Sequence, residues 1–331
     1  MDRKSLINQL QLAYCPLCNY DFSILKHDPI IQELLQTSSL YVLVQRPELS
    51  FENIVPNEDE KFIDFEIHQK NNHEVLKCRL PFFQENIATD QEKEVLLYFG
   101  SNDPSHKFDK LPITNVHGIK FYESSNDTEN FLVWFSPEKF ILNWVKGYFQ
   151  ADIEGDFRKL LKYQVLYVGK ATDQEIWERL TGHETLQEIL SVEYPLVYGS
   201  LPTHEIALLL FNFHDNLSIR TFDYESSIDD MVDSLKGNDR PDQKTIFLDA
   251  EKALVKAMLP KHNKILFKGY PKSKDGLEKH KYDAFSYTFM DPITLTYDQG
   301  EIEGGLYYLG GDTIIVTDNK NMELLKHIKS T

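Results

Sequence analysis

The sequence is poor in cysteine and in long apolar runs. It has 3 cysteines among 331 residues, a small and odd number that excludes a disulfide framework and favours a reducing compartment. The longest apolar runs, such as 206–211, are much shorter than a membrane span requires. The first twenty residues lack the continuous apolar core of a secretory signal. We therefore expect a cytoplasmic protein with no membrane partner.

Basic residues are also scarce. The chain has 35 Lys and Arg residues against 52 Asp and Glu, which gives a formal net charge of −17. Such a chain is repelled by nucleic acid unless its positive charge is concentrated in one place. The sequence also lacks a P-loop and a G-x-S-x-G nucleophile elbow. Its length and its 41% hydrophobic content are sufficient for a sizeable core and two domains.

The first domain is expected over residues 1–150. Residues 1–36 look helical at both ends, and from Ser39 the pattern changes to short aromatic or β-branched runs separated by polar turns, which predicts a β-rich fold. Ser136 and Pro137 then predict the capped start of a helix. We place the domain boundary in the acidic segment 150–158. The predicted strands cover residues 41–44, 62–67, 75–80, 95–99, 119–122 and 131–135.

A C-x-x-C turn, Cys15 to Cys18, lies near the start of this domain. Such a turn supplies two of the four ligands of a structural zinc site. The only obvious further pair in this half of the chain is His73 and Cys78. We expect two ordinary half-buried cysteines here rather than zinc.

Residues 163–190 predict a strand, a tight glycine turn and a helix. The β-favouring run 165–168 stops at Gly169, and apolar residues from Ile176 to Leu190 then recur at three- and four-residue steps. Asp173 is a suitable helix N-cap. Arg179 and His183 are four positions apart, so we expect them one turn apart on one helix face. This arrangement places the strand end, the turn and that helix face close together.

The last third of the chain predicts a buried strand at 205–213, a helix at 246–259 that Pro260 ends, and further strands between 284 and 317. The only concentrated positive charge is in residues 251–281, where nine lysines stand among three acidic residues. Together with Phe267 and Tyr270, these lysines suit contact with a nucleic-acid backbone. A solvated lysine-rich loop is the alternative.

These residues resemble the GIY-YIG nuclease family. Tyr167-Val168-Gly169 stands where the family has its YIG triplet, and Lys170 follows it directly. The positions of Arg179 and His183 match the family's helix-borne arginine and a histidine often found one turn later. Glu251 matches its metal-binding glutamate, and Asn263 matches the asparagine that closes the same helix.

The resemblance implies an α+β protein. A β-rich N-terminal domain would precede, over residues 151–331, a GIY-YIG-like α/β domain with a small antiparallel sheet flanked by helices and a C-terminal β extension. It also implies hydrolysis of phosphodiester bonds in nucleic acid, which we expect to be DNA, in a setting such as restriction or antiviral genome defence.

In the implied mechanism Glu251 holds one Mg²⁺ or Mn²⁺, and Arg179 neutralises charge on the phosphate. Tyr167 or His183 prepares the attacking water. The backbone of the nucleic acid would be bound by a further set of residues, namely Lys170, Lys252, Lys256, Asn263, Lys264 and Lys268.

The family's first triplet, GIY, is missing from the ten or so residues before Tyr167, where the chain reads ADIEGDFRKLLKY. Tyr148 and Tyr163 are the nearest substitutes. The absent triplet and the net negative charge leave a second hypothesis open. In that hypothesis the chain is a catalytically inactive binding or assembly module that acts with a protein partner or as a homo-oligomer.

Overall fold

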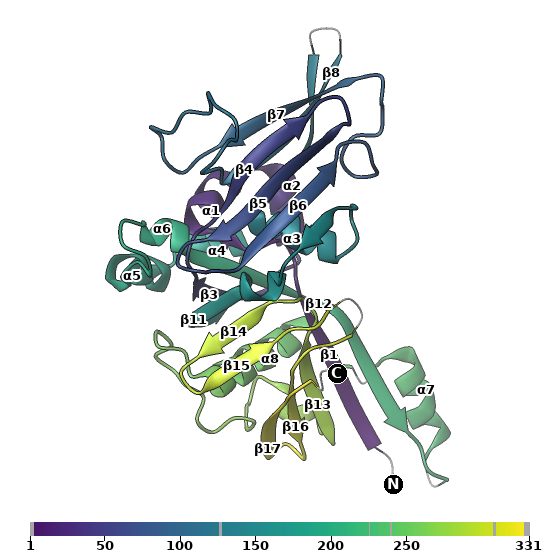
Figure 1. Ribbon diagram of the computed structural model, residues 1–331. Helices are drawn as coiled ribbons and strands as arrows, with labels where there is room; N and C mark the ends of the chain where they lie inside the picture. The colour runs from purple at the N-terminus through teal and green to yellow at the C-terminus, as the bar shows by residue number, and fades with distance from the viewer. Residues whose placement is uncertain (1–2, 126–127, 225, 239, 307–308, 328–331) are drawn as a thin grey trace. The chain divides into compact units, whose positions relative to one another are not determined.

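The chain divides into two compact units, which do not follow the predicted boundary near residue 150. The computed structural model describes residues 3–125, 128–224, 226–238, 240–306 and 309–327. Unit 1 comprises Met1–Arg46, Tyr163–Tyr194 and Leu201–Thr331, and unit 2 comprises Pro47–Lys162 and Pro195–Ser200 (Figure 1). The first 46 residues therefore group with the second half of the chain, whereas we expected segments 1–150 and 151–331 to be separate domains.

Unit 1 is built on one large mixed sheet. β1 and β13 run parallel, whereas the pairs β1–β12, β3–β11, β3–β12, β13–β16, β14–β15 and β16–β17 are antiparallel. The short strand β2 (Leu17–Cys18) pairs with β12 outside the main order. The order across the sheet is β15 (Gly300–Glu303), β14 (Thr294–Tyr297), β11 (Lys162–Lys170), β3 (Leu40–Gln45), β12 (Ile206–Thr221), β1 (Arg3–Leu12), β13 (Ala284–Phe289), β16 (Thr313–Thr317) and β17 (Asn321–Leu325).

This sheet corrects the predicted fold class. We expected a small antiparallel sheet flanked by helices within residues 151–331, but the sheet is large and mixed, and strands hold 39% of the residues against 23% in helices. Three of its strands, β1, β2 and β3, come from the N-terminal segment. The expected C-terminal extension is also part of the sheet, because β13 pairs directly with β1.

The N-terminal segment shows why the prediction failed. We expected a helix from Leu6 onwards, but residues 3–12 form β1, in which Leu6, Asn8, Leu10 and Leu12 are buried at every second position. This alternation is typical of a strand, and the apolar Ile7 beside Leu6 disguised it. The second predicted helix is confirmed as α2 (Pro29–Leu35), which is capped by Asp28.

The long helix α8 (Gln243–Met258) carries the buried face that organises the C-terminal part of unit 1. Asp242 caps its start, and it ends where Leu259 adopts a left-handed conformation before Pro260. It packs against β3 and β16. The buried carboxylate of Asp249 accepts hydrogen bonds from the Tyr270 and Tyr287 hydroxyls at 2.5 and 2.8 Å. These bonds fix the segment after the helix to its inner face. The remaining helices of unit 1 are α1 (Asn19–Leu25), α4 (Ile176–Thr181), α5 (Glu184–Val192), α6 (Pro202–Glu205), α7 (Ile228–Lys236) and the 3₁₀ turn Leu277–His280.

Unit 2 contains two smaller antiparallel sheets and confirms the strands predicted for residues 62–135. One sheet has the order β10 (Asp152–Glu154), β6 (Val75–Pro81), β5 (Phe62–Gln69) and β4 (Leu49–Asn57). The other has the order β7 (Glu94–Gly100), β8 (Gly118–Ser125) and β9 (Thr128–Phe135). The helix α3 (Pro137–Val145) starts at its Ser136 cap as predicted, and a 3₁₀ turn follows at Phe157–Lys159. Edge-to-face aromatic pairs, such as Phe65 with Phe140 at 5.0 Å, fill the core.

Cys15, Cys18 and Cys78 form no disulfide, and all three are buried. The thiol of Cys18 caps α1 by accepting a hydrogen bond from the Asp21 backbone N–H at 3.3 Å. Within the described residues, no helix combines the length and the apolar character needed to cross a bilayer.

Candidate functional site

Near the end of β11, two tyrosine rings pack closely against Gly169. Gly169 lies opposite Tyr41 in the antiparallel pair. A Cβ atom on Gly169 would lie 2.5 Å from the Tyr41 ring and 2.6 Å from the Tyr167 ring. Glycine is therefore required by packing, since real Cβ atoms do not approach other atoms so closely. The rings of Tyr41 and Tyr167 lie 6.1 Å apart on this face of the sheet.

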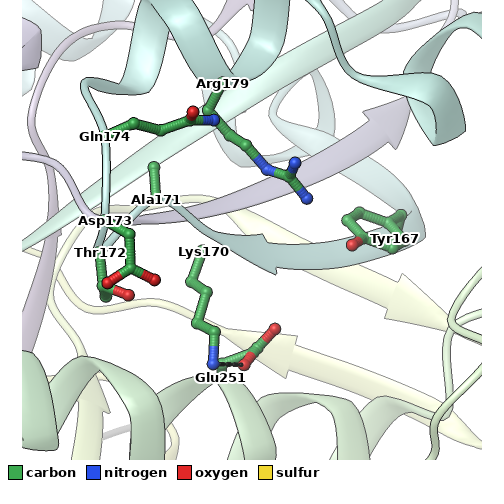
Figure 2. Close-up of a pocket in the computed structure, with 8 residues that line it drawn as sticks. All are labelled: Tyr167, Lys170, Ala171, Thr172, Asp173, Gln174, Arg179 and Glu251. Atoms are coloured by element: carbon green, nitrogen blue, oxygen red, sulfur yellow. Dashed lines mark ion pairs between the residues drawn. The ribbon is translucent and has the colours of Figure 1, made fainter.

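A pocket of about 370 Å³ opens where β11 ends. Figure 2 shows that Arg179 extends from α4 towards Tyr167, while Lys170 extends from the end of β11 towards Glu251 on α8. Four of the side chains that the sequence analysis named therefore lie together, although Glu251 is far from the others along the chain. The pocket is lined by Tyr167, Lys170, Ala171, Thr172, Asp173, Gln174, Arg179 and Glu251.

Glu251 is a buried carboxylate with one unsatisfied oxygen. Its residue is 9% exposed, and the ammonium of Lys170 lies 3.1 Å from its Oε2 atom. The ammonium approaches outside hydrogen-bonding geometry, so Oε2 receives no hydrogen bond within the described residues. Burial raises the pKa of Glu251, and the nearby Lys170 charge offsets only part of this rise. An incompletely paired buried carboxylate is costly for folding, which makes this position a candidate for function.

Arg179 has no carboxylate partner among the described residues. In the described part of the chain, neither Glu175 nor Glu178 on its own helix forms an ion pair with it. Glu175 is instead the N-cap residue of α4. The expected cap, Asp173, forms an ion pair with Lys244 at 2.5 Å. A half-buried guanidinium with no acid beside it suits the binding of an anion such as phosphate.

The predicted helix over 176–190 is broken at Gly182, which ends α4. His183 is consequently the N-cap of α5, and its Nδ1 atom accepts a hydrogen bond from the Leu186 backbone N–H at 3.0 Å. It does not lie one helical turn above Arg179 on a continuous helix, and it does not line the pocket. The expectation that it shares one helix face with Arg179 is therefore wrong.

His183 instead contacts Tyr41, a residue that the sequence did not single out. Because Nδ1 accepts a hydrogen bond, the neutral ring carries its proton on Nε2, which donates to the Tyr41 hydroxyl at 2.6 Å. Burial and the positive charge of Arg179 lower the pKa of His183 to about 4, so the ring is neutral near pH 7. With both nitrogens occupied, His183 holds Tyr41 in place and is not available to activate water.

Tyr41 and Tyr167 are both neutral at physiological pH. Burial raises the pKa of each hydroxyl, and the nearby charge of Glu251 raises that of Tyr167 further. Arg179 opposes the rise in both cases. Neither suggested substitute for the missing tyrosine, Tyr148 or Tyr163, lines the pocket. Tyr41, in contrast, lies on the strand that pairs with the Tyr167-Val168-Gly169 segment.

The predicted nucleic-acid contacts lie elsewhere in unit 1 or have other partners. Lys252 is buried and forms an ion pair with Asp275 at 2.6 Å. The Lys256 ammonium donates to the Lys268 carbonyl oxygen at 3.1 Å. The exposed residues Lys264 and Lys268 do not line the pocket. Among the predicted contacts, only Lys170 lines it.

Asn263 has a structural contact in place of the predicted ligand contact. Its side chain accepts a hydrogen bond from the Val168 backbone N–H at 2.9 Å and donates to the Val168 carbonyl oxygen at 2.8 Å. This two-point contact joins the segment after α8 to β11. It therefore fixes the helix that carries Glu251 relative to the strand that carries Tyr167.

A hard divalent cation fits the donor chemistry of Glu251. Mg²⁺ is commonly held by one or two carboxylates, with water molecules completing its octahedral shell. The unsatisfied Oε2 atom offers one such ligand. Within the described residues there is no cluster of three or more His, Cys, Asp or Glu side chains placed to hold a metal, so water or substrate would supply most of the remaining ligands.

No protein-family model, curated protein or solved structure matches the chain. The resemblance to GIY-YIG nucleases therefore remains a prediction based on the residues quoted above.

Proposed function

We propose that unit 1 hydrolyses phosphodiester bonds in nucleic acid at the pocket between β11, α4 and α8, with one Mg²⁺ or Mn²⁺ bound by Glu251. The observation that carries this proposal is the meeting of complementary groups in one pocket. A guanidinium without an acid partner, Arg179, lines the same space as a buried carboxylate with an unsatisfied oxygen, Glu251, and a phenol, Tyr167.

Each group has a role suited to phosphodiester hydrolysis. Arg179 binds the non-bridging phosphate oxygens through its planar donor fork. A cation at Glu251 would stabilise charge on an ester oxygen. Tyr167 is neutral and therefore orients the attacking water by hydrogen bonding rather than by removing its proton. The expected use of His183 as a base is replaced by a positioning role, because both of its ring nitrogens are engaged.

The GIY-YIG resemblance supports the same chemistry. Our candidate for the missing first tyrosine is Tyr41, which pairs across the strands with Gly169. A cytoplasmic nuclease in restriction or genome defence is the biological setting we propose, with DNA as the substrate.

A non-catalytic binding or assembly module is the second candidate. It is favoured by the net charge of −17 and by the pairing of Lys252 with Asp275 and of Lys261 with Glu193, which weakens the predicted basic segment. In this case the pocket would bind a phosphate group without cleaving it, and a partner protein would supply most of the affinity.

Cleavage assays separate the two candidates. Plasmid DNA, single-stranded DNA and RNA are incubated with the protein and Mg²⁺ or Mn²⁺, beside the variants Glu251→Gln and Arg179→Ala. We expect each substitution to lower the cutting rate by roughly 10²–10³-fold, the range found when one transition-state contact is removed. Lys244→Met, a change outside the pocket lining, is the matched control and should cut normally. Folded protein that cuts none of these substrates with either ion would contradict the enzyme and favour the module.

A further inference from the structure

The pairing of Lys170 with Glu251 is the feature of the pocket that the proposed reaction does not explain. The resemblance implies that Lys170 binds the nucleic-acid backbone, but its ammonium lies 3.1 Å from Oε2 of Glu251. Oε2 of Glu251 is also the atom that we propose as the cation ligand, and it receives no hydrogen bond within the described residues. Figure 2 shows the Lys170 side chain directed at Glu251, with the guanidinium of Arg179 on the other side of the pocket.

An ammonium and a divalent cation are mutually exclusive at this oxygen. Two positive charges a few ångströms apart repel strongly where water is partly excluded, and Glu251 is almost fully buried. The ammonium is also held without a hydrogen bond to Oε2, so a cation that replaces it breaks no such bond. The Lys170 ammonium therefore occupies the position proposed for the cation, and a divalent ion can replace it there.

We propose that Lys170 is an exchangeable internal cation. A divalent ion that binds Glu251 displaces the ammonium, which then turns into the pocket and binds the phosphate beside Arg179. The inference rests on the proposed function, because it assumes that Glu251 is the cation ligand. It adds a coupling that the proposed function does not contain, namely that cation binding creates part of the phosphate site.

The surroundings of Lys170 allow this movement. It is the last residue of β11, its side chain is 29% exposed, and a pocket of about 370 Å³ lies beside it. A lysine side chain is flexible and its ammonium has three rotatable donors. The other ion pair of a pocket-lining residue, Lys244 with Asp173, is much more open, with side-chain exposures of 54% and 78%. That pair has similar charges but does not occupy the proposed cation position, which makes it the natural control.

Because the ammonium and the cation compete for Glu251, the exchange predicts two binding results that cutting assays do not report. Each result couples the cation position to the phosphate position. Removal of the ammonium should tighten cation binding, because the cation no longer has to displace it. Removal of the Glu251 charge should tighten phosphate binding without any metal, because Lys170 is then released into the pocket.

The cation result is measured by titrating Mn²⁺ and recording the free ion by electron paramagnetic resonance. We expect Lys170→Met to bind Mn²⁺ at least about tenfold more tightly than the unaltered protein, within the usual range of coupling between sites. Lys244→Met removes an equal charge and should change the affinity by less than about threefold. Lys170→Gln serves as a second variant if the methionine variant does not fold.

The phosphate result is measured without metal, by the fluorescence anisotropy of a labelled four-nucleotide phosphorothioate oligothymidylate. Glu251→Gln should bind it about fivefold or more tightly than the unaltered protein, at the lower end of such couplings. Asp173→Asn removes an equal negative charge from the same pocket and should have a smaller effect. Equal effects of the two substitutions would mean that general electrostatics suffices, and would overturn the proposal.

The outcomes distinguish failure of this inference from failure of the proposed function. If Glu251→Gln abolishes Mn²⁺ binding but Lys170→Met does not strengthen it, Lys170 is not an exchangeable cation and the proposed function is unaffected. If Glu251→Gln leaves Mn²⁺ binding unchanged, Glu251 is not the cation ligand, and the inference falls together with the metal site of the proposed function.

Discussion

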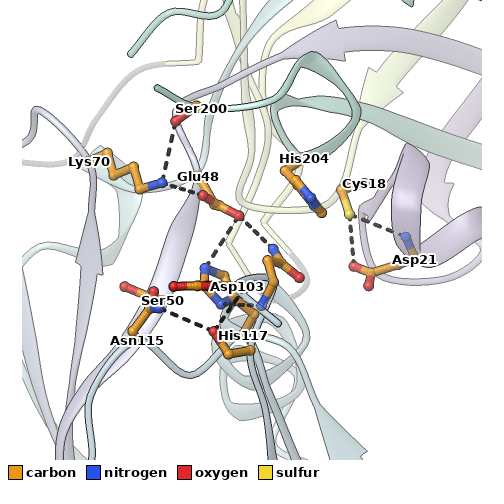
Figure 3. A network of polar contacts seen from close by, with 12 residues as sticks. Cys18, Asp21, Glu48, Ser50, Lys70, Asp103, Asn115, His117, Ser200 and His204 are labelled. Carbon is orange, nitrogen blue, oxygen red and sulfur yellow. Dashed lines mark hydrogen bonds and ion pairs between the residues drawn. The ribbon is translucent and has the colours of Figure 1, made fainter. Parts of the chain in front are cut away.

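Two buried glutamates, Glu48 in unit 2 and Glu251 in unit 1, each face one lysine ammonium, but their other partners differ. Figure 3 shows Glu48 at the centre of a polar network with Lys70 and His117. Its Oε2 accepts a hydrogen bond from Lys70 at 2.5 Å, and its Oε1 accepts one from the Asn102 amide at 2.5 Å and lies 3.3 Å from Nε2 of His117. At Glu251, Oε2 accepts no hydrogen bond.

The electrostatic consequences are opposite. Burial alone would raise the pKa of Glu48, but the hydrogen bonds from Lys70 and Asn102 and the nearby His117 more than offset it, so the pKa is lowered. At Glu251 burial prevails over Lys170, and the pKa is raised. A carboxylate whose oxygens are all engaged stabilises its surroundings, whereas one with an unsatisfied oxygen is kept at a cost to stability. The comparison indicates that Glu48 stabilises unit 2, and it supports the proposal that Glu251 is a site residue.

The largest expected effect is on stability. Glu48→Gln should lower the free energy of unfolding by roughly 3 kcal/mol, because the amide has one acceptor oxygen, so the Lys70 ammonium or the Asn102 amide then faces an NH2 donor, and the negative charge beside Lys70 is lost. Glu251→Gln should change it by less than about 1 kcal/mol, since only a partly exposed lysine loses a partner. Urea unfolding followed by circular dichroism measures both. Equal losses for the two variants would remove the distinction between a structural and a functional glutamate.

The next effect concerns the packing that shapes the Glu251 pocket. Gly169→Ala should cost about 2 kcal/mol, because the new methyl group overlaps two tyrosine rings, one of which is fully buried and held by His183. Gly182→Ala is the control in the same segment, since nothing lies within 4 Å of its added Cβ atom. We expect that change to remain within about 0.5 kcal/mol. A Gly169→Ala variant with an unchanged free energy of unfolding would show that the Tyr41 ring can move away from the added methyl group at no cost.

Much of this local structure was predictable from sequence. The strand before Gly169 and the helix that carries Glu251 are found where their apolar patterns predict them. The continuous apolar run at 205–213 likewise corresponds to the buried first part of β12, which continues to Thr221. The capping residue Ser136 also marked the start of α3 correctly. Local signals of this kind act within a few residues, so they depend little on which distant strands pair.

The role of Tyr41 was not predictable in the same way. Its strand β3 pairs with β11, but most of unit 2 lies between the two strands in the sequence. We expected the first tyrosine within a few residues of Tyr167 in the sequence. No local sequence pattern specifies that two strands so far apart along the chain will pair. The break of the 176–190 helix was also missed, because the apolar period continues through Gly182.

The two glutamates also predict opposite pH dependences. The lowered pKa of Glu48 gives a stabilisation that is present above its unfolded value and is lost as the pH falls through its folded value. The raised pKa of Glu251 gives a contribution that is present below its unfolded value and is lost as the pH rises through its folded value. From pH 7 to pH 3, the stability gap between the unaltered protein and Glu48→Gln should therefore shrink. Over the same range, the stability of the unaltered protein should increase relative to that of Glu251→Gln. Gaps that move in the same direction would contradict the assignment.

A smaller effect is expected at His183. His183 has a pKa of about 4, so the cutting rate between pH 5.5 and 8 should show no step from its titration. His183→Asn preserves an N-cap residue but removes the bond to Tyr41, and it should lower the rate without changing the shape of this profile. A step near pH 6.5 that disappears in this variant would show that His183 titrates in the reaction.

The most direct test of the central claim is the position of a bound cation. Crystals of the protein soaked in Mn²⁺ would be examined by anomalous scattering. We predict a peak at coordination distance from Oε2 of Glu251, about 2.1 Å for a small hard cation, with the ammonium of Lys170 moved away from that oxygen. A map at saturating Mn²⁺ with no peak at Glu251, and with Lys170 still beside it, would contradict the account.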